Sequence, residues 1–454
     1  MQTNKIYVVT GSGQGHLYPC MELCRFLSSR NYHTTLVISS NLSTAIPSSF
    51  TENPLHEIAQ ISPSPRPIPG SAPLSHQSAH ELEAHLVTHA RVPDLPPPLC
   101  AIIDFQMGWT KRVFWKFDIP VIGLFTFGAC AAAMEWGAWK VHAGDLKPGE
   151  TLPVHGLPEE MSLTHSDLLR KSFGQPRGSG GPKPGGGPPK PGDRPPWVPE
   201  IQGSIGLMFN TCDYIDRPFI EYMADQMGMP AWGVGPLLPQ QYWNSSGSLI
   251  RNRERQSNFT EDEIIQWLDS KPRGSVLYVA FGSEVGPTME EHQQLACALE
   301  ELDRPFVWVI QPGSGGLDKK VGDRGLIICG WAPQLLILSH KSTGGFLSHC
   351  GWNSTMEAIG RGIPFLAWPI RGDQYFNAKL VVSYHKVGYR VAHDLSLLIT
   401  KDDIFKGVER LMGDIQMKRR AEALSAQFEH GFPATSVAAL DAFEDFISQK
   451  QKPV

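Results

Sequence analysis

The chain has 454 residues, 41% of them hydrophobic, and a formal net charge of −5. This length suggests two or three domains, and the composition is typical of a globular protein with more than one core. A weakly negative chain gives no reason to expect nucleic acid or an anionic membrane surface as a partner.

The cysteines and the N-terminus indicate a reduced, cytoplasmic protein. Eight cysteines are too few for a disulfide framework in so long a chain, and none has the spacing of a metal site. The N-terminus goes directly into a strand-like run and lacks the apolar stretch of a secretory signal. The most apolar later segment, 119–134, is shorter than the ~20 residues that span a bilayer. We therefore expect no metal, no membrane insertion and a monomer.

The first predicted unit is a strand, a glycine-rich turn and a helix in IYVVTGSGQGHLYPCMELCRFL, residues 6–27. Gly11 and Gly13 fit a dinucleotide-binding fingerprint, but His16 stands where the third glycine is required. The second strand, TTLVISS, ends in serines, whereas an acidic residue would be needed there to hold a ribose. Because both tests fail, we do not expect NAD to bind.

His16 is a candidate general base. Gly13 and Gly15 allow a tight turn and the close approach of a small acceptor molecule, and His16 follows at the start of the helix. The positive end of the helix dipole disfavours the imidazolium and keeps the ring neutral, as a base requires. The alternative, a histidine that only packs or caps the helix, stays open on this evidence.

Asp104 is the candidate partner of this histidine. It ends the apolar run CAIID at 100–104, and ligands of open α/β sheets bind at the carboxyl ends of the strands. A carboxylate there would set the tautomer of His16 and stabilise its charged form. Asp104 could equally be a structural cap of the helix that follows.

Strand-like and helical segments alternate along the chain, which predicts parallel sheets with crossover helices. The strand-like runs of the first series are IYVVT, TTLVISS, LCAIIDF, PVIGLFT and IGLMFNT, and this series ends before residue 240. The second series begins at 275 with SVLYVAFGS and continues with FVWVIQP, GLIICGW, TGGFLSH and PFLAWP. We therefore expect two facing, doubly wound, Rossmann-like α/β domains with a helical C-terminus. The predicted ranges are 1–240 for the first domain, 241–262 for a polar linker and 263–454 for the second domain.

Residues 174–196 belong to neither series, because they are mostly glycine and proline. Such a segment cannot bury enough apolar surface to order itself. It predicts a flexible loop or, alternatively, a proline-rich ligand for a partner domain.

The second motif is STGGFLSHCGWNSTMEAIGRG, residues 342–362, where a strand ends and a helix begins. His349, Asn353 and Ser354 gather where free backbone N–H groups point outward, which is an anion site suited to a diphosphate. Glu357, one turn further, could accept hydrogen bonds from ribose hydroxyls. Asn and Ser at a helix start are ordinarily only caps, but this density of polar and aromatic residues exceeds what capping requires.

The segment from Trp331 to Gln374 closely resembles the 44-residue signature box of plant secondary-product UDP-glycosyltransferases, without a gap. The resemblance extends to the glycine turn before His16 and to the segment that ends in FGS at 281–283. It implies a GT-B architecture, in which the C-terminal domain mainly holds the sugar nucleotide and the N-terminal domain mainly holds the acceptor. UDP-sugar would be a co-substrate, and no cofactor is implied.

The resemblance also implies roles for individual residues. His16 would be the catalytic base and Asp104 its partner. The UDP-sugar would be held by Thr126, Ser283, Trp331, Gln334, His349, Trp352, Asn353, Ser354, Glu357, Asp373 and Gln374. Within this set Trp331 would stack on the uracil, and Trp352, Asp373 and Gln374 would line the sugar. Ser283 and Thr126 would complete the donor pocket from opposite sides.

The donor and the acceptor follow less directly. In this family a terminal Gln in the box goes with glucose, so Gln374 favours UDP-glucose, although Arg371 and Gly372 depart from the family pattern close to the sugar. For the acceptor side we name Gly15, Phe105, Phe125 and Trp136, since an aromatic wall suits planar rings, while a core role for such aromatics is the alternative. We expect an inverting glucosyltransferase acting on a small phenolic such as a flavonoid. The alternatives are a terpenoid or hormone acceptor, C-glycosylation of a phenolic, and a sugar-nucleotide-binding protein without turnover.

Overall fold

The structure is a computed structural model that describes residues 4–63, 77–93, 95–170, 190–243, 257–282, 286–310 and 322–450. Contacts divide the chain into two compact units. Unit 1 comprises residues 1–129, 194–239 and 432–454, and unit 2 comprises 130–193 and 240–431. The predicted glycine- and proline-rich loop and the predicted linker lie largely outside the described residues, and so does Ser283.

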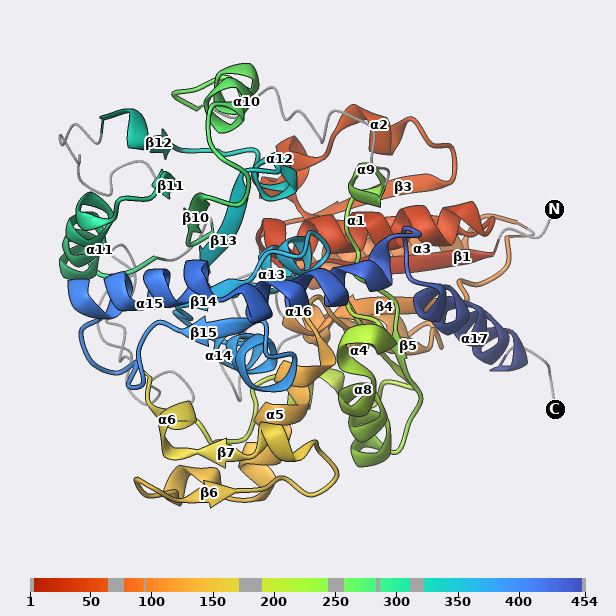
Figure 1. The fold of residues 1–454 in the computed structure, drawn as a ribbon. Helices are drawn as coiled ribbons and strands as arrows, with labels where there is room; N and C mark the ends of the chain where they lie inside the picture. Colours follow the sequence, from red (N-terminus) through yellow and green to blue (C-terminus); the bar gives the residue numbers. More distant parts are fainter. Residues whose placement is uncertain are drawn as a thin grey trace. The chain divides into compact units, whose positions relative to one another are not determined.

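The sheet of unit 1 has parallel strands in the order β3-β2-β1-β4-β5-β8-β9 (Figure 1). The strands are β1 (Lys5–Val9), β2 (His33–Ser39), β3 (His56–Ile61), β4 (Cys100–Asp104), β5 (Val121–Phe125), β8 (Leu207–Phe209) and β9 (Ala231–Gly233). Its helices are α1 (Gln14–Ser29), α2 (Ser48–Thr51), α3 (Gln77–Ala90), α4 (Lys111–Trp115), α7 (Val198–Ile201), α8 (Asp213–Met227) and α17 (Ala434–Lys450), with a 3-10 turn, η3 (Phe105–Thr110).

Both faces of this sheet are covered, because side chains alternate along each strand. Ile6 and Val8 of β1 pack in the core that includes buried residues of α1 and α17. Tyr7 and Val9 point to the other face and pack in the core that includes α3 and α4. Because both faces are packed, only the ends of the strands and the loops that follow them remain to form a site.

The sheet of unit 2 repeats the pattern, with parallel strands in the order β12-β11-β10-β13-β14-β15. The strands are β10 (Val276–Ala280), β11 (Phe306–Ile310), β12 (Gly325–Cys329), β13 (Thr343–Ser348), β14 (Phe365–Ala367) and β15 (Gly388–Arg390), with a separate antiparallel pair of β6 (Thr151–Leu152) and β7 (Leu163–Thr164). The helices are α6 (His165–Leu168), α9 (Gln240–Trp243), α10 (Glu261–Asp269), α11 (Met289–Glu301), α12 (Gln334–Ser339), α13 (Trp352–Ile359), α14 (Gln374–Lys379), α15 (Lys401–Gly413) and α16 (Ile415–Ser425), while α5 (Ala129–Lys140) begins at the end of the first range of unit 1.

The compact units differ from the predicted domain ranges in two places. The C-terminal helix α17 groups with unit 1, because its Leu440, Phe443 and Ile447 are buried in a core with residues of β1 and α1. Figure 1 shows this helix, in dark blue, as the last element of the chain.

Residues 130–193 group with unit 2, and a buried ion cluster fixes part of this segment. Asp167 of α6 accepts from Lys379 and from Arg390, each at 2.7 Å. Burial alone would raise the pKa of Asp167, but the two cations outweigh it and lower the pKa to about 2.

The predicted strands and the predicted fold class are confirmed. In both sheets the order reverses beside the first strand of the unit, between β1 and β4 and between β10 and β13. This is the topology of a doubly wound Rossmann-like domain, in which ligands bind outside the carboxyl ends of the strands at the reversal. The sequence pattern missed β3, β9 and β15, and also the antiparallel pair β6 and β7. β9 and β15 have only three residues each, and β6 and β7 have only two each.

Candidate active site

The first polar cluster lies at the reversal of the unit 1 sheet. His16 lies in the first turn of α1, which follows β1, and Asp104 is the last residue of β4, the neighbouring strand. Gly13 precedes α1 with a φ of 93°, a left-handed conformation that glycine adopts without strain. The tight turn predicted from the glycines is therefore present, and it brings the helix start to the end of β4.

His16 and Asp104 form a hydrogen-bonded pair, with 2.6 Å between Nδ1 and Oδ2. The Asp104 carboxylate is fully buried, while 17% of the His16 side chain is exposed. Because a carboxylate only accepts hydrogen bonds, the neutral imidazole carries its proton on Nδ1. The other ring nitrogen, Nε2, is then the basic atom.

Asp104 is also a cap, so both alternatives raised by the sequence hold. Its Oδ1 accepts the backbone N–H of Gln106 at 2.9 Å, at the start of η3. Its Oδ2 also accepts the backbone N–H of Gly11 at 3.2 Å. One carboxylate therefore fixes the turn after β4, the turn after β1 and the ring of His16.

Two further side chains contact the imidazole. Thr126, which follows β5, places Oγ1 2.9 Å from Nδ1, and Gln106 places its amide nitrogen 2.9 Å from Nε2. Thr126 was predicted to complete the donor pocket; the structure places it against the ring of His16, and a contact with UDP-sugar stays a prediction. Gln106 was missed, and only its position two residues after Asp104 could have indicated it.

An aromatic cluster lies beside His16. The ring of Phe105 is 6.2 Å from that of His16 and stacks on Phe125 at 5.5 Å. Phe105 is half-buried, whereas Phe125 is fully buried against Phe209 and other rings. Phe105 is thus the more exposed of these two rings, and Phe125 stacks against it from within the core.

The other two residues predicted for the acceptor differ in setting. Gly15 is exposed at the start of α1, with open space where a side chain would be. Trp136 belongs to unit 2, where its ring lies 5.1 Å from that of Trp139. Contact of either residue with an acceptor stays a prediction.

The second cluster lies at the reversal of the unit 2 sheet, after β13. Cys350 has a φ of 59°, which turns the chain sharply between His349 and the start of α13. Side chains at Gly282 or Gly351 would collide with the ring of His349. Burial lowers the pKa of His349, a backbone hydrogen bond to Ala280 opposes this shift and the nearby Arg371 adds to it, and the resulting pKa is about 4. The ring is therefore neutral at physiological pH and carries a single N–H.

Gln334, Ser354 and Glu357 form one hydrogen-bonded group. The Gln334 amide donates to Ser354 Oγ at 2.8 Å and to Glu357 Oε2 at 2.6 Å. The amide is itself oriented by Tyr278, whose hydroxyl donates to Oε1 at 3.1 Å. Tyr278 was missed, because it reads as an ordinary strand residue of β10. Burial raises the pKa of Glu357 to about 7, with the Gln334 hydrogen bond opposing the shift.

The remaining predicted donor residues surround this group in sequence but differ in exposure. Trp331, Asn353 and Asp373 are half-buried, and Trp352 and Gln374 are buried. The Gln374 side-chain oxygen accepts the backbone N–H groups of Ile370 and Arg371, each at 2.9 Å. Gly372 lies in this turn with a φ of 57°, so its departure from the family pattern supplies a left-handed residue.

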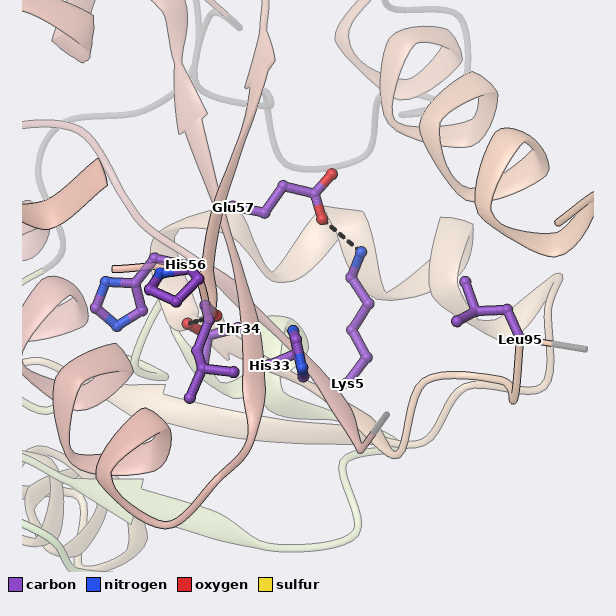
Figure 2. A pocket seen from close by; sticks show the side chains of 8 residues that line it. Lys5, His33, Thr34, His56, Glu57 and Leu95 are labelled. Carbon is purple, nitrogen blue, oxygen red and sulfur yellow. Dashed lines mark hydrogen bonds and ion pairs between the residues drawn. The ribbon is translucent and has the colours of Figure 1, made fainter. Parts of the chain in front are cut away.

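A separate cavity of about 170 Å³ lies at the opposite edge of the unit 1 sheet, at the amino ends of the strands (Figure 2). It is lined by Lys5, His33, Thr34, Pro54, Leu55, His56, Glu57 and Leu95. Lys5 and Glu57 form an ion pair at 2.5 Å, and His56 bonds to Phe50 O and Ser28 Oγ. These charged groups are already paired, so the cavity adds no polar cluster comparable to the other two.

The described part of the chain contains neither a metal-binding cluster nor a membrane-spanning helix. Within it, no three His, Cys, Asp or Glu residues gather as they would around a metal ion. None of the helices described has the length and apolar character needed to cross a membrane.

Comparison with known proteins places this geometry in a family. The family model described as "UDP-glucoronosyl and UDP-glucosyl transferase" matches residues 254–436. UDP-glycosyltransferase 73C5 of Arabidopsis thaliana is 32% identical over 72% of this chain and 69% of its own length. UDP-glycosyltransferase 73C3 of the same plant is 30% identical over 88% of this chain and 86% of its own length. The chain belongs to the plant UDP-glycosyltransferase family.

A solved structure extends the likeness to the fold of this UDP-glycosyltransferase. Phytolacca americana UGT2, complexed with UDP-2fluoro-glucose and pterostilbene, is 25% identical, covers 99% of both chains and has a TM-score of 0.74. The predicted GT-B fold is confirmed. The protein is therefore a glycosyltransferase that uses a UDP-sugar, and its two polar clusters lie where a doubly wound fold binds ligands.

Proposed function

We propose that this UDP-glycosyltransferase transfers glucose from UDP-glucose to a hydroxyl of a small phenolic acceptor, with inversion and without a metal ion or bound cofactor. The hydrogen bond between His16 and the buried Asp104 carries the proposal, because a protein that only binds a sugar nucleotide needs no such pair. We further expect the enzyme to act as a monomer in the cytoplasm.

The proposed step balances as a direct displacement. The acceptor O–H gives its proton to His16 Nε2 as the oxygen attacks the anomeric carbon. Asp104 stabilises the resulting imidazolium through Nδ1–H. The bond between the anomeric carbon and the phosphate oxygen breaks, and UDP leaves with the electron pair. A single displacement inverts the anomeric carbon, which converts an α-linked donor into a β-glycoside.

The donor is proposed to be held by unit 2. The start of α13 and the N–H of His349 would stabilise the charge that grows on the diphosphate. Glu357, oriented by its contact with Gln334, would accept the ribose hydroxyls. Trp331 would stack on the uracil, and the turn at Gln374 would line the glucose. The fluorinated UDP-glucose in the Phytolacca americana structure supports a glucose donor.

The acceptor is proposed to be a phenol because of the groups around the base. Phe105 offers a half-buried ring beside His16, and flat aromatic acceptors stack well on such a face. A phenol also loses its proton more readily than an alcohol, so one neutral imidazole suffices. The pterostilbene in the Phytolacca americana structure agrees with an aromatic acceptor.

The test is product analysis by mass spectrometry with UDP-glucose and a panel of flavonoids, simple phenols and terpenoid alcohols. We expect the wild type to add one hexose to phenols and His16→Ala to lose this activity. His33→Ala is the matched control, since His33 is the half-buried histidine that lines the distant cavity of Figure 2. Transfer only to terpenoids would refute the proposal of a phenolic acceptor. Binding of UDP-glucose without any product would refute the proposed glucosyl transfer.

A further inference from the structure

The basic nitrogen of His16 already has a hydrogen-bond partner in the protein. Since Nδ1 faces Asp104 at 2.6 Å, the neutral ring presents a lone pair at Nε2. The side-chain nitrogen of Gln106 lies 2.9 Å from that atom. This is the position that the hydroxyl of an acceptor must occupy to give up its proton.

The orientation of the Gln106 amide follows from its neighbours. Nε2 of the neutral imidazole can only accept, so the amide must present its NH₂ group and not its oxygen. The hydroxyl of Ser12 lies 3.4 Å from the amide oxygen, on the other side of the group. The backbone N–H of Gln106 is held by Asp104 Oδ1 at 2.9 Å. The main chain is therefore fixed, while the half-buried side chain can move.

We propose that Gln106 positions the acceptor oxygen, an inference that rests on the proposed function. Without an acceptor, its amide covers Nε2. When an acceptor hydroxyl takes that place, the hydroxyl donates to Nε2 and the displaced amide N–H donates to the same oxygen. The oxygen then holds two hydrogen bonds, one through its own proton and one through a lone pair. The remaining lone pair is the one that attacks the anomeric carbon.

This contact predicts which acceptors react well. As the proton moves to Nε2, negative charge grows on the acceptor oxygen, and an N–H donor to a charged oxygen is stronger than one to a neutral oxygen. The gain is largest for the most basic oxygens, so weakly acidic phenols depend most on Gln106. A carbon nucleophile offers no comparable lone pair. Gln106 therefore favours O-glycosylation over C-glycosylation.

The kinetic test compares Gln106→Met, which keeps the size of the side chain and removes the donor, with Met107→Leu in the same turn as the control. For a series of para-substituted phenols, we expect Gln106→Met to lower kcat/KM roughly 10- to 100-fold, the range for losing a hydrogen bond to a charged group. The loss should grow as the phenol becomes less acidic. The affinity for UDP-glucose should not change, which also shows that the variant is folded.

A loss of equal size for every phenol would mean that Gln106 only supports the turn, and no loss would mean that it does not touch the acceptor. Either result overturns the proposal. Gln106→Glu offers a second variant with the same shape. Its carboxylate cannot donate, so it should be at least as impaired as Gln106→Met; wild-type activity in this variant would also refute the proposal.

A second measurement needs no turnover. Diethyl pyrocarbonate acylates neutral imidazole at an accessible nitrogen, and peptide mapping reports the rate at His16 alone. We expect Gln106→Met to react severalfold faster than the wild type and Met107→Leu to react at the wild-type rate. Equal rates in all three would show that the amide does not cover Nε2. If the wild type glycosylates no phenol but His16 shows the expected protection, the proposed function fails while the Gln106 contact stands.

Discussion

Asp104 determines which nitrogen of the neutral His16 ring carries the proton, and it would also stabilise the positively charged ring. The carboxylate is fully buried and bonds to Nδ1 at 2.6 Å, which leaves Nε2 as the acceptor. Asparagine would still accept the N–H of Gln106, but its amide would face Nδ1 as a donor. The ring would then carry its proton on Nε2 and could no longer act as a base.

We therefore expect Asp104→Asn to lower kcat by about 10³- to 10⁴-fold, the effect of a wrong tautomer in comparable pairs. Steady-state kinetics with a phenolic acceptor measure this loss. The dissociation constant for UDP-glucose, whose proposed ligands lie in unit 2, is the control and should stay constant. Retention of more than a tenth of the activity would show that Asp104 is only a structural cap.

If Glu357 binds the donor as proposed, it should make UDP-glucose binding depend on pH. Burial raises the pKa of this carboxyl to about 7, and hydroxyls of the ribose would bond best to its ionised form. Binding should therefore weaken as the pH falls below about 7, by up to roughly tenfold per pH unit. His349 does not titrate in this range, because its pKa is lowered to about 4.

Calorimetric titration of UDP-glucose between about pH 6 and pH 8 tests this expectation, because the nucleotide sugar itself has no group that titrates there. Glu357→Gln should bind more weakly at the upper end and lose the pH dependence. A slope that persists in the variant would assign the titration to another group.

The raised pKa of Glu357 also makes the stability of the fold depend on pH, in the opposite direction to the binding of UDP-glucose. Its pKa is about 7 in the folded protein and 4.5 as the unperturbed value, so the folded state binds more protons between these limits. Stability contributed by this group is therefore lost as the pH rises through the window. At about pH 8, Glu357→Gln should be more stable than the wild type by about 3 kcal/mol and should therefore unfold at a higher temperature. A lower melting temperature at that pH would contradict the raised pKa.

At the scale of elements, helix α13 is hydrogen-bonded to Tyr242 of α9, a residue of the predicted linker 241–262. Tyr242 of α9 is buried, and its hydroxyl donates to the carbonyl of Glu357 at 3.1 Å. Arg361 donates to the carbonyl of Tyr242 at 2.6 Å and stacks over its ring at 4.2 Å. A side chain at Gly360 would collide with the Tyr242 hydroxyl. The contacts of Tyr242 therefore account for both the glycine at 360 and the arginine at 361.

We expect Gly360→Ala to destabilise the protein by about 1–3 kcal/mol, as overpacking of a buried contact does. Adding Tyr242→Phe should recover part of this loss, because it removes the atom that the new methyl group meets. Gly413→Ala is the control, since Gly413 lies at the end of α15 with open space around it. Thermal melts of the wild type, Gly360→Ala, Tyr242→Phe and the double variant give the coupling energy between the two sites. Additive effects would show that the two sites do not touch.

At the scale of the whole molecule, the chain returns to unit 1 after completing unit 2. The last helix, α17, buries Leu440, Phe443 and Ile447 in the core around β1 and α1, and Trp232 of β9 packs edge-on against Phe443 at 5.7 Å. The core that supports the start of α1, and with it His16, therefore includes residues more than four hundred positions away in the sequence. The C-terminal helix thus packs in the core of unit 1, although it follows the proposed donor-binding residues of unit 2 in the sequence.

Phe443→Ala should destabilise unit 1 by about 3–5 kcal/mol, the usual cost of emptying a large aromatic site. Hydrogen exchange resolved by peptide should show faster exchange in β1 and α1, with β13 and α13 unchanged. Val437→Ala is the control on the same helix, because Val437 is 40% exposed. Equal acceleration in both units would mean that they unfold as one.

The fold class, most strands of the two sheets and the residues that end those strands could be predicted from the sequence. Alternating apolar runs encode parallel strands directly, and residues at strand ends, such as Asp104 and His349, must meet at the edge of the sheet whatever else the chain does. The glycine turns before His16 were readable for the same reason, because the need for a left-handed residue is local.

The side chains that complete each cluster could not be predicted, because they meet only through tertiary contacts. Gln106, Thr126 and Tyr278 approach their partners from strands and turns far away in sequence, and hydrogen bonds of this kind leave no periodic signal. The grouping of α17 with unit 1 was hidden too, because an amphipathic helix shows that it has an apolar face but not which core will cover it. Likewise, Phe105 and Phe125 have the same aromatic character in the sequence. Packing alone leaves one half-buried beside the base and buries the other.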